Sequence, residues 1–195
     1  MKRLDHTDSN RAGMTLMEIV IVLGIVSVVS AMGLPKLDLS QYRADAAAQQ
    51  VRSVFQTAQR TSLTRQYDVI VSVDTIQGGL RIAEDVNNNG SIEVSEWKFW
   101  RPVGQGNKFV VPPKGISGTV TKSVVGPQLS TVDALPSVIF HRNGSSSSDA
   151  EIYVSSTNRN RVDYRAITLT RATGRSEVFR FGGTGSSGSW RILSR

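Results

Sequence analysis

Residues 15–34 read TLMEIVIVLGIVSVVSAMGL, an apolar run that contains one charged residue, Glu18. A helix of about 20 residues rises roughly 30 Å, which matches the hydrocarbon core of a bilayer. A helix that packs on a soluble core would show a polar face, and this run shows none. A secretory signal peptide would have a shorter apolar region ending at a small-residue cleavage site, whereas Pro35-Lys36 follows here. The stretch therefore predicts a transmembrane helix over residues 14–35.

The charges that flank this stretch predict its orientation. Three basic residues lie within residues 1–13, whereas Lys36 and Arg43 follow the apolar run. Because basic flanks favour the cytoplasmic side, we expect a cytoplasmic N-terminus and an exported segment over residues 36–195. Glu18 is costly inside an apolar span, and such residues are functional candidates. The alternative is that Glu18 lies at the level of the lipid headgroups and is tolerated there.

The junction over residues 11–22 reads RAGMTLMEIVIV. It resembles the processing site of type IV pilins and type II secretion pseudopilins, in which a membrane peptidase cuts after the Gly and methylates the new N-terminal amine. The resemblance implies a leader over residues 1–13, cleavage between Gly13 and Met14, and N-methylation of Met14. It also makes Glu18 the assembly residue, although Met replaces the Phe that is commonest at the first mature position.

A buried ion pair explains why such a family would keep a carboxylate at Glu18. After cleavage Met14 carries a cationic amine, and Glu18 of one subunit can pair with the amine of a neighbour inside a filament. In an apolar core the pair is attractive, whereas either charge alone is costly. The implied partners are the prepilin peptidase, other major and minor pilins or pseudopilins, and the lipid of the bacterial inner membrane.

The segment after Pro35 predicts a second helical stretch. Pro35 lies where the family often kinks its helix, and apolar residues then recur at spacings of three and four. We expect an amphipathic helix over residues 36–66 that continues the rod of residues 14–35 and packs on a sheet. Its expected apolar stripe is Leu39, Tyr42, Ala46, Val51, Val54, Phe55, Ala58 and Leu63.

Residues 67–195 alternate apolar and polar side chains between clusters of turn residues, which predicts a β-rich domain. We expect strands near residues 68–75, 79–83, 96–101, 108–111, 116–125, 137–141, 150–155, 164–171, 176–181 and 190–193. A long N-terminal helix packed on antiparallel sheets is an α+β fold. With the Gly174-Arg175 turn, this layout resembles the H-type minor pseudopilins, the GspH/FimT group.

Residues 85–96 read DVNNNGSIEVSE and fit the calcium-loop spacing D-x-[DN]-x-[DN]-G-x5-E. Ca²⁺ takes roughly six to eight oxygen ligands, and a glycine at the centre of the loop permits the sharp turn. Because strands rather than helices are expected on both sides, the loop would be a hairpin connection and not an EF-hand. The alternative is a polar Asn-Gly turn that needs no ion. The candidate ligands are Asp85, Asn87, Asn89, Ser91, Glu93 and Glu96.

The chain has 195 residues and a formal net charge of +7. Residues 1–13 hold three basic and two acidic side chains, so +6 remains from Met14 onward. From residue 157 to the end, eight arginines are opposed by two acidic residues. A basic balance fits nucleic acid, anionic lipid, an acidic partner or solubility alone.

The arginines near the C-terminus make DNA a candidate partner. Some H-type minor pilins of competence pili bind DNA through arginines in this region, but their motif has a second Arg where this chain has Glu177. The preferred interpretation is a solvated face or one that meets acidic neighbouring pilins. The DNA-binding candidates are Arg171, Arg175, Arg180 and Arg191.

The remaining motifs do not favour catalysis. There is no Cys, which excludes disulfides and thiolate metal sites. His141 is the one histidine outside the leader, and neither a nucleophile elbow nor an H-E-x-x-H pattern is present. The expected function is non-enzymatic: a minor subunit of a type II secretion pseudopilus or a type IV pilus that supports protein export. The alternative is a minor pilin that binds DNA for uptake.

Overall fold

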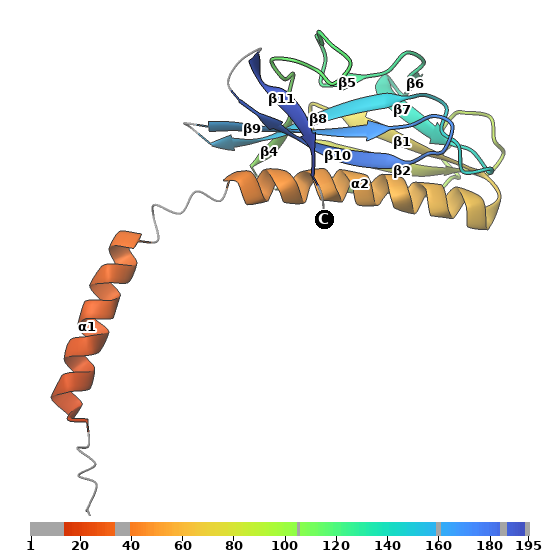
Figure 1. Ribbon diagram of the computed structural model, residues 1–195. Coiled ribbons are helices and arrows are strands. Elements are labelled where there is room, and N and C mark those ends of the chain that lie inside the picture. The colour runs from red at the N-terminus through yellow and green to blue at the C-terminus, as the bar shows by residue number, and fades with distance from the viewer. Residues whose placement is uncertain (1–13, 34–39, 105, 159–160, 184–186, 194–195) are drawn as a thin grey trace, which may run out of the picture. The chain divides into compact units, whose positions relative to one another are not determined.

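The computed structural model describes residues 14–33, 40–104, 106–158, 161–183 and 187–193. The chain divides into two units, Met1–Asp38 and Leu39–Arg195 (Figure 1). Among its described residues the first unit contains the helix α1 (Leu16–Gly33). Every side chain described in this unit, from Met14 to Ser30, is exposed to solvent.

Within the described residues, no helix combines the length and the apolar character needed to cross a membrane. The assignment of residues 14–35 as a transmembrane segment therefore stays a prediction. Residues 1–13 and Pro35 lie outside the described residues, as does the connection between the two helices, so the expected continuous rod is not tested.

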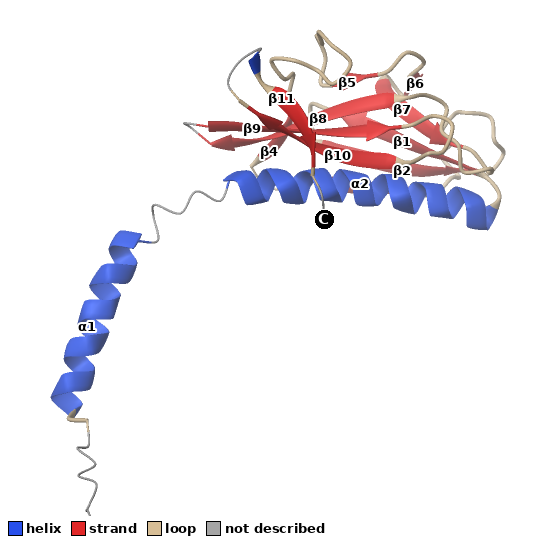
Figure 2. Ribbon diagram, in the orientation of Figure 1, coloured by secondary structure: helices blue, strands red, loops and turns tan. Residues whose placement is uncertain are grey.

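The second unit is an α+β domain of one helix and eleven antiparallel strands among its described residues (Figure 2). The helix is α2 (Ser40–Arg65). The first sheet has the order β3-β2-β1-β7-β6 and the second β11-β10-β9-β8-β4, with β5 also paired to β8. The strands are β1 (Asp68–Asp74), β2 (Gly79–Asp85), β3 (Lys98–Pro102), β4 (Asn107–Phe109), β5 (Val124–Val125), β6 (Ser130–Val132), β7 (Leu135–Phe140), β8 (Ala150–Asn158), β9 (Arg161–Leu169), β10 (Ser176–Gly182) and β11 (Ser189–Ile192).

Helix α2 lies along both sheets and contacts β1 and β7 of the first and β4, β8, β9 and β10 of the second (Figure 2). The predicted fold class is therefore confirmed. The core lies between the helix and the sheets, where Val51, Phe55 and Phe140 are buried together. The rings of Phe55 and Phe140 are 5.9 Å apart between centroids, which ties the middle of α2 to the first sheet.

The expected apolar stripe of this helix is correct from Val51 to Ala58 and wrong at Tyr42, Ala46 and Leu63. Val51, Val54, Phe55 and Ala58 are buried, whereas Tyr42 is 73% exposed and Ala46 is also exposed. The buried positions near the start of α2 are Ala44, Ala47 and Ala48. Small side chains on that face allow the helix backbone to approach the second sheet, where a tyrosine would not fit. Leu63 is 43% exposed, and Leu39 lies outside the described residues.

Most of the predicted strands are present with ends shifted by one to three residues, but the strand predicted over residues 116–125 is wrong. Only Val124–Val125 is a strand, because a turn interrupts the segment: the Gly115 N–H donates to the Gly118 carbonyl at 2.7 Å. Strand β6 was not predicted. It joins β7 through Asp133 and Ala134, which have φ angles of 49° and 62°. This two-residue turn lacks the glycine that usually marks a hairpin of this type in a sequence.

Candidate functional site

The N-terminal end of α1 holds the residues that the sequence associates with assembly. Met14 is 68% exposed, and Glu18 lies in the first turn of the helix. The Glu18 N–H donates to the Thr15 hydroxyl at 3.2 Å and to the Thr15 carbonyl at 3.1 Å. Thr15 is therefore the N-cap, and a carboxylate in this first turn is stabilised by the positive end of the helix dipole.

Thr15 is a residue that the sequence analysis did not single out. The signal that identifies it is the spacing Thr15-x-x-Glu18, which matches a capping box. The cap fixes where α1 begins, and it places Met14 immediately before the helix and Glu18 one turn into it. Gly13, on the other side of the predicted cut, lies outside the described residues.

A second polar cluster fixes the start of α2 on the second sheet. The Arg165 Nε donates to Asp45 Oδ1 at 2.5 Å, and the Arg180 guanidinium binds the other oxygen of the same carboxylate. Arg165 is 1% exposed, so it is a buried cation whose counter-charge comes from the helix. The Ser40 hydroxyl adds a bond to Asp163 at 2.8 Å. Neither Asp45 nor Arg165 was predicted as part of a site, and the two residues lie 120 positions apart in the sequence.

The four arginines proposed for DNA do not form one surface. Arg180 is opposite Arg191 in the ladder between β10 and β11, and Arg191 is exposed with no ion pair to any described residue. Arg171 and Arg175 lie at the turn before β10, and five residues of strand from Arg175 to Arg180 span about 16 Å.

Three of these arginines are already engaged. Arg180 binds Asp45, Arg175 pairs with Glu177 at 2.9 Å, and Arg171 donates to the Gln128 side-chain oxygen at 2.9 Å. Glu177 is the residue at which this chain departs from the DNA-binding motif, and its carboxylate takes up one of the candidate cations. DNA binding stays a prediction, without a continuous arginine surface to support it.

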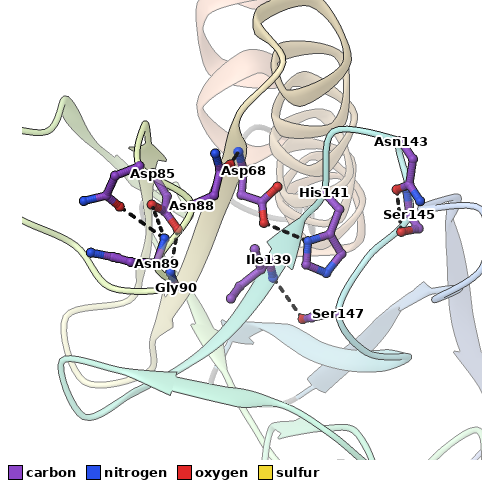
Figure 3. Close-up of polar contacts among 11 residues, drawn as sticks. Asp68, Asp85, Asn88, Asn89, Gly90, Ile139, His141, Asn143, Ser145 and Ser147 are labelled. Atoms are coloured by element: carbon purple, nitrogen blue, oxygen red, sulfur yellow. Dashed lines mark hydrogen bonds and ion pairs between the residues drawn. The ribbon is translucent and has the colours of Figure 1, made fainter.

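The candidate calcium loop connects β2 to β3, so the predicted hairpin setting is correct. Asp85 is fully buried, and its carboxylate accepts the N–H groups of Asn89 at 3.0 Å and Gly90 at 2.7 Å (Figure 3). Gly90 has a φ of 76°, the left-handed conformation that glycine adopts most easily. The carboxylate of Asp85 therefore acts here as the organiser of a turn.

The other candidate ligands of the loop bind one another. The amide groups of Asn87 and Asn89 donate to Glu93 Oε1 at 3.0 and 2.9 Å. Glu96 accepts the N–H groups of Val86 and Glu93, and the Ser91 N–H donates to Asn89. The sequence motif thus does bring its side chains together. Among the described residues, however, no group of three or more His, Cys, Asp or Glu side chains is arranged to hold a metal ion.

Calcium therefore stays a prediction, and thermal unfolding of the whole chain tests it. A ligand at 100 times its dissociation constant stabilises the folded state by about 2.7 kcal/mol, which raises the melting temperature by roughly 5–11 °C for a protein of this size. We expect calcium to give this rise and Glu96→Gln to abolish it, with magnesium as the control ion. A melting temperature indifferent to calcium and to a chelator would leave the polar turn as the correct interpretation.

His141 lies just after β7 next to this loop. Its Nδ1 is 2.8 Å from Asp68 Oδ2, and the Asp68 N–H donates to the Asn88 side chain at 2.7 Å (Figure 3). The nearby Ser145 and Ser147 hydroxyl oxygens contact Asn143 and the Ile139 N–H. His141 therefore links the end of β7 to the start of β1.

Comparison with known proteins identifies the N-terminal segment. Residues 8–34 match the family described as the prokaryotic N-terminal methylation motif. The predicted junction Gly13-Met14 and Glu18 both lie inside the matched segment. The chain therefore carries the N-terminal methylation motif of prepilin-type proteins.

The chain is similar to two solved structures of the minor pseudopilin EpsH from the type II secretion system of Vibrio cholerae. One has 9% sequence identity and a TM-score of 0.45, and covers 78% of this chain and 97% of EpsH. The other has 10% identity and a TM-score of 0.46, with 79% and 97% covered. No curated protein sequence matches the chain.

Proposed function

We propose that this chain is the precursor of a minor pseudopilin-like subunit. A prepilin peptidase cuts it between Gly13 and Met14 and methylates Met14. The mature chain then assembles into the pseudopilus of a type II secretion system or into a type IV pilus, and supports protein export without catalysing a reaction. The observation that carries the proposal is the methylation motif over residues 8–34, which contains the junction and Glu18.

The exposed surface of α1 supports assembly in an apolar setting. Leu16 is 81% exposed and Val29 64%, and the other large apolar side chains described between them are uncovered as well. Burying such side chains is worth about 1.5–3 kcal/mol each, so a partner environment is strongly favoured. In the proposed function the lipid of the inner membrane covers α1 before assembly, and helices of neighbouring subunits cover it afterwards. The N-terminus is then cytoplasmic and the domain of α2 and the sheets periplasmic.

The packing of the turn between β9 and β10 is a structural observation that supports the H-type assignment. Gly174 has a φ of 61°, and a Cβ there would lie 2.3 Å from the Gly144 carbonyl oxygen and 2.5 Å from Gln59 Nε2. The Gln59 amide of α2 donates to the carbonyls of Gly144 and Thr173, both at 2.7 Å. The Gly-Arg turn that resembles the H-type family is thus held against α2 at a position where only glycine fits.

Mass spectrometry of the chain extracted from membranes tests the proposed processing. We expect the N-terminus at Met14 with one added methyl group, because Gly13 lacks a side chain that would obstruct the peptidase at the cut. In Gly13→Val we expect the leader to remain attached. The matched control is Gly24→Val in α1, where an added Cβ meets no atom within 4 Å. An intact leader on the unchanged chain, in cells that contain the peptidase, would refute the assignment.

A further inference from the structure

An open groove of about 650 Å³ lies between α2 and the outer edge of the first sheet. Its floor is apolar and comes from the helix and from β1 and β2 (Val54, Ala58, Val69 and Ile82). One side is a row of hydroxyl groups on α2, from Ser53, Thr57 and Thr61, and the other is β3 with the residue before it. Part of the domain core is therefore reachable from this edge.

Strand β3 has a free edge. It is the outermost strand of the first sheet, no described strand pairs with its outer side, and all five of its residues are exposed. The Glu84 N–H donates to the Trp97 carbonyl at 3.1 Å, so Trp97 and every second residue after it turn their backbone groups toward β2. By the same alternation, Lys98 and Trp100 direct their N–H and C=O groups outward.

The side chains on the groove face of this edge are aromatic and uncovered. Trp97 and Phe99 are 54% and 40% exposed, and their rings are stacked, with centroids 5.9 Å apart and planes 5° from parallel. The Arg101 guanidinium lies 5.3 Å from the Phe99 centroid and extends the stack. Exposed aromatic surface beside an unpaired strand is a marker of a binding site, because natural edges of this kind are otherwise covered.

The charges around the groove select an acidic occupant. Arg65 and Arg101 line it, and Lys98 adds a positive charge to the same strand on the face opposite Phe99 and Arg101. Of the described lining residues, Glu84 is the one carboxylate; it accepts the Tyr67 hydroxyl and pairs with Arg65 at 3.3 Å, which leaves Arg101 as the lining cation without an ion pair to a described residue. A second copy of this chain carries the same excess of basic residues, with a formal net charge of +7, so its approach to this edge is electrostatically unfavourable. Pro102 has no N–H, so it limits the added strand to a short one.

We infer that the free edge of β3 and the adjoining groove form a docking site for a short, extended, acidic segment of another protein. The segment adds a strand to β3 through Lys98 and Trp100 and places alternate apolar side chains over Trp97 and Phe99. Its carboxylates alternate with these apolar side chains and meet Lys98 on the opposite face of the strand, while Arg101 lies on the groove face beside Phe99. The inference rests on the proposed function for the identity of the partner, which is then an acidic neighbouring subunit of the filament.

Fluorescence anisotropy with the full chain in detergent micelles tests this site. The probe is a labelled synthetic peptide in which valine and glutamate alternate. Two comparison peptides isolate the two contributions: one carries lysine in place of glutamate, and one has methylated backbone nitrogens that cannot donate to β3. We expect the acidic peptide to bind, and each comparison peptide to bind at least about tenfold more weakly, which corresponds to about 1.4 kcal/mol.

A charge-reversed double variant provides the matched test on the protein. K98E/R101E should bind the acidic peptide more weakly and the lysine peptide more tightly than the unchanged chain does. The control, K108E/R191E, has the same change in net charge on the two outer strands of the second sheet, β4 and β11, and should bind as the unchanged chain does. Because Trp97 and Phe99 are exposed, Trp97→Ala and Phe99→Ala should weaken binding while the melting temperature stays nearly constant.

Four outcomes would overturn the inference: no binding of the acidic peptide, equal binding of the acidic and lysine peptides, full affinity of the methylated peptide, or equal losses in the two double variants. Self-association by light scattering that K98E/R101E abolishes would assign the edge to a second copy instead. Processing at Gly13 is measured separately. If the chain is cut and methylated but does not bind the peptide, only the docking site is refuted. If the chain is not cut but binds the peptide, the proposed filament role is refuted and the docking site is retained.

Discussion

Glu18→Ala should leave the precursor cut after Gly13 and yet lower its incorporation into filaments by about 100-fold or more. In the assembled state the Met14 amine of one subunit would face the position of Glu18 in a neighbour. Removing one partner of a buried ion pair leaves the other charge unpaired, at a cost of about 3–5 kcal/mol. Because each 1.4 kcal/mol is a factor of ten, even the lower figure corresponds to about 100-fold.

Immunoblots of sheared filaments and of the membrane fraction measure that incorporation. Glu18→Gln keeps the shape and removes the charge, so it should fail nearly as badly as the alanine variant. Thr15→Ala is the matched control at the same helix end. It removes the cap that binds the Glu18 N–H but keeps the carboxylate, and the loss of a cap costs about 0.5–2 kcal/mol. Incorporation of Glu18→Ala at the normal level would remove the assembly role of this residue.

Asp45→Asn should destabilise the domain by about 3 kcal/mol or more, since it leaves Arg165 buried without a counter-charge. Arg165 is 1% exposed, and Asp45 is the carboxylate that it binds. For a protein of this size each kcal/mol shifts the melting temperature by about 2–4 °C, so a fall of at least about 6 °C is expected. Near-ultraviolet circular dichroism of the full chain during heating measures the change.

The control for Asp45→Asn is Glu177→Gln, an equivalent change of acid to amide. Glu177 pairs with Arg175, whose side chain is 74% exposed, and exposed pairs of this kind contribute about 0–1 kcal/mol. Its melting temperature should therefore stay close to that of the unchanged chain. Equal melting temperatures for the two variants would show that the Asp45 cluster does not hold the helix on the sheet.

The features that could be predicted from the sequence are those set by residues close to one another along the chain. The prepilin junction, the helix that ends near Arg65, and the strands with regular alternation are all local patterns, and the structure contains the helices and these strands. The loop over residues 85–96 was also recognisable, because its spacing reflects hydrogen bonds between residues a few positions apart, such as Asn89 to Asp85.

The wrong predictions concern features that depend on contacts between residues far apart in the sequence. Asp45 and Arg165 are separated by 120 positions, so no local pattern indicates that a polar side of α2 lies against β9. The same contact explains why Ala44, Ala47 and Ala48 are buried in place of Tyr42. Trp97 and Phe99 were expected within a strand, but only the strand order shows that this strand is an open edge. The groove could not be predicted for that reason.

The position of the Asp45 cluster has a mechanical consequence. A pull that reaches the domain along the chain from α1 enters through the first residues of α2. There it meets the Ser40 bond to Asp163 and the two arginines bound to Asp45 before it reaches the buried Ala47 and Ala48. Van der Waals contacts between small side chains would let the helix slide, whereas displacing Asp45 strands a buried cation. The Asp45 cluster therefore resists sliding of α2 along the second sheet and keeps the two in register under tension.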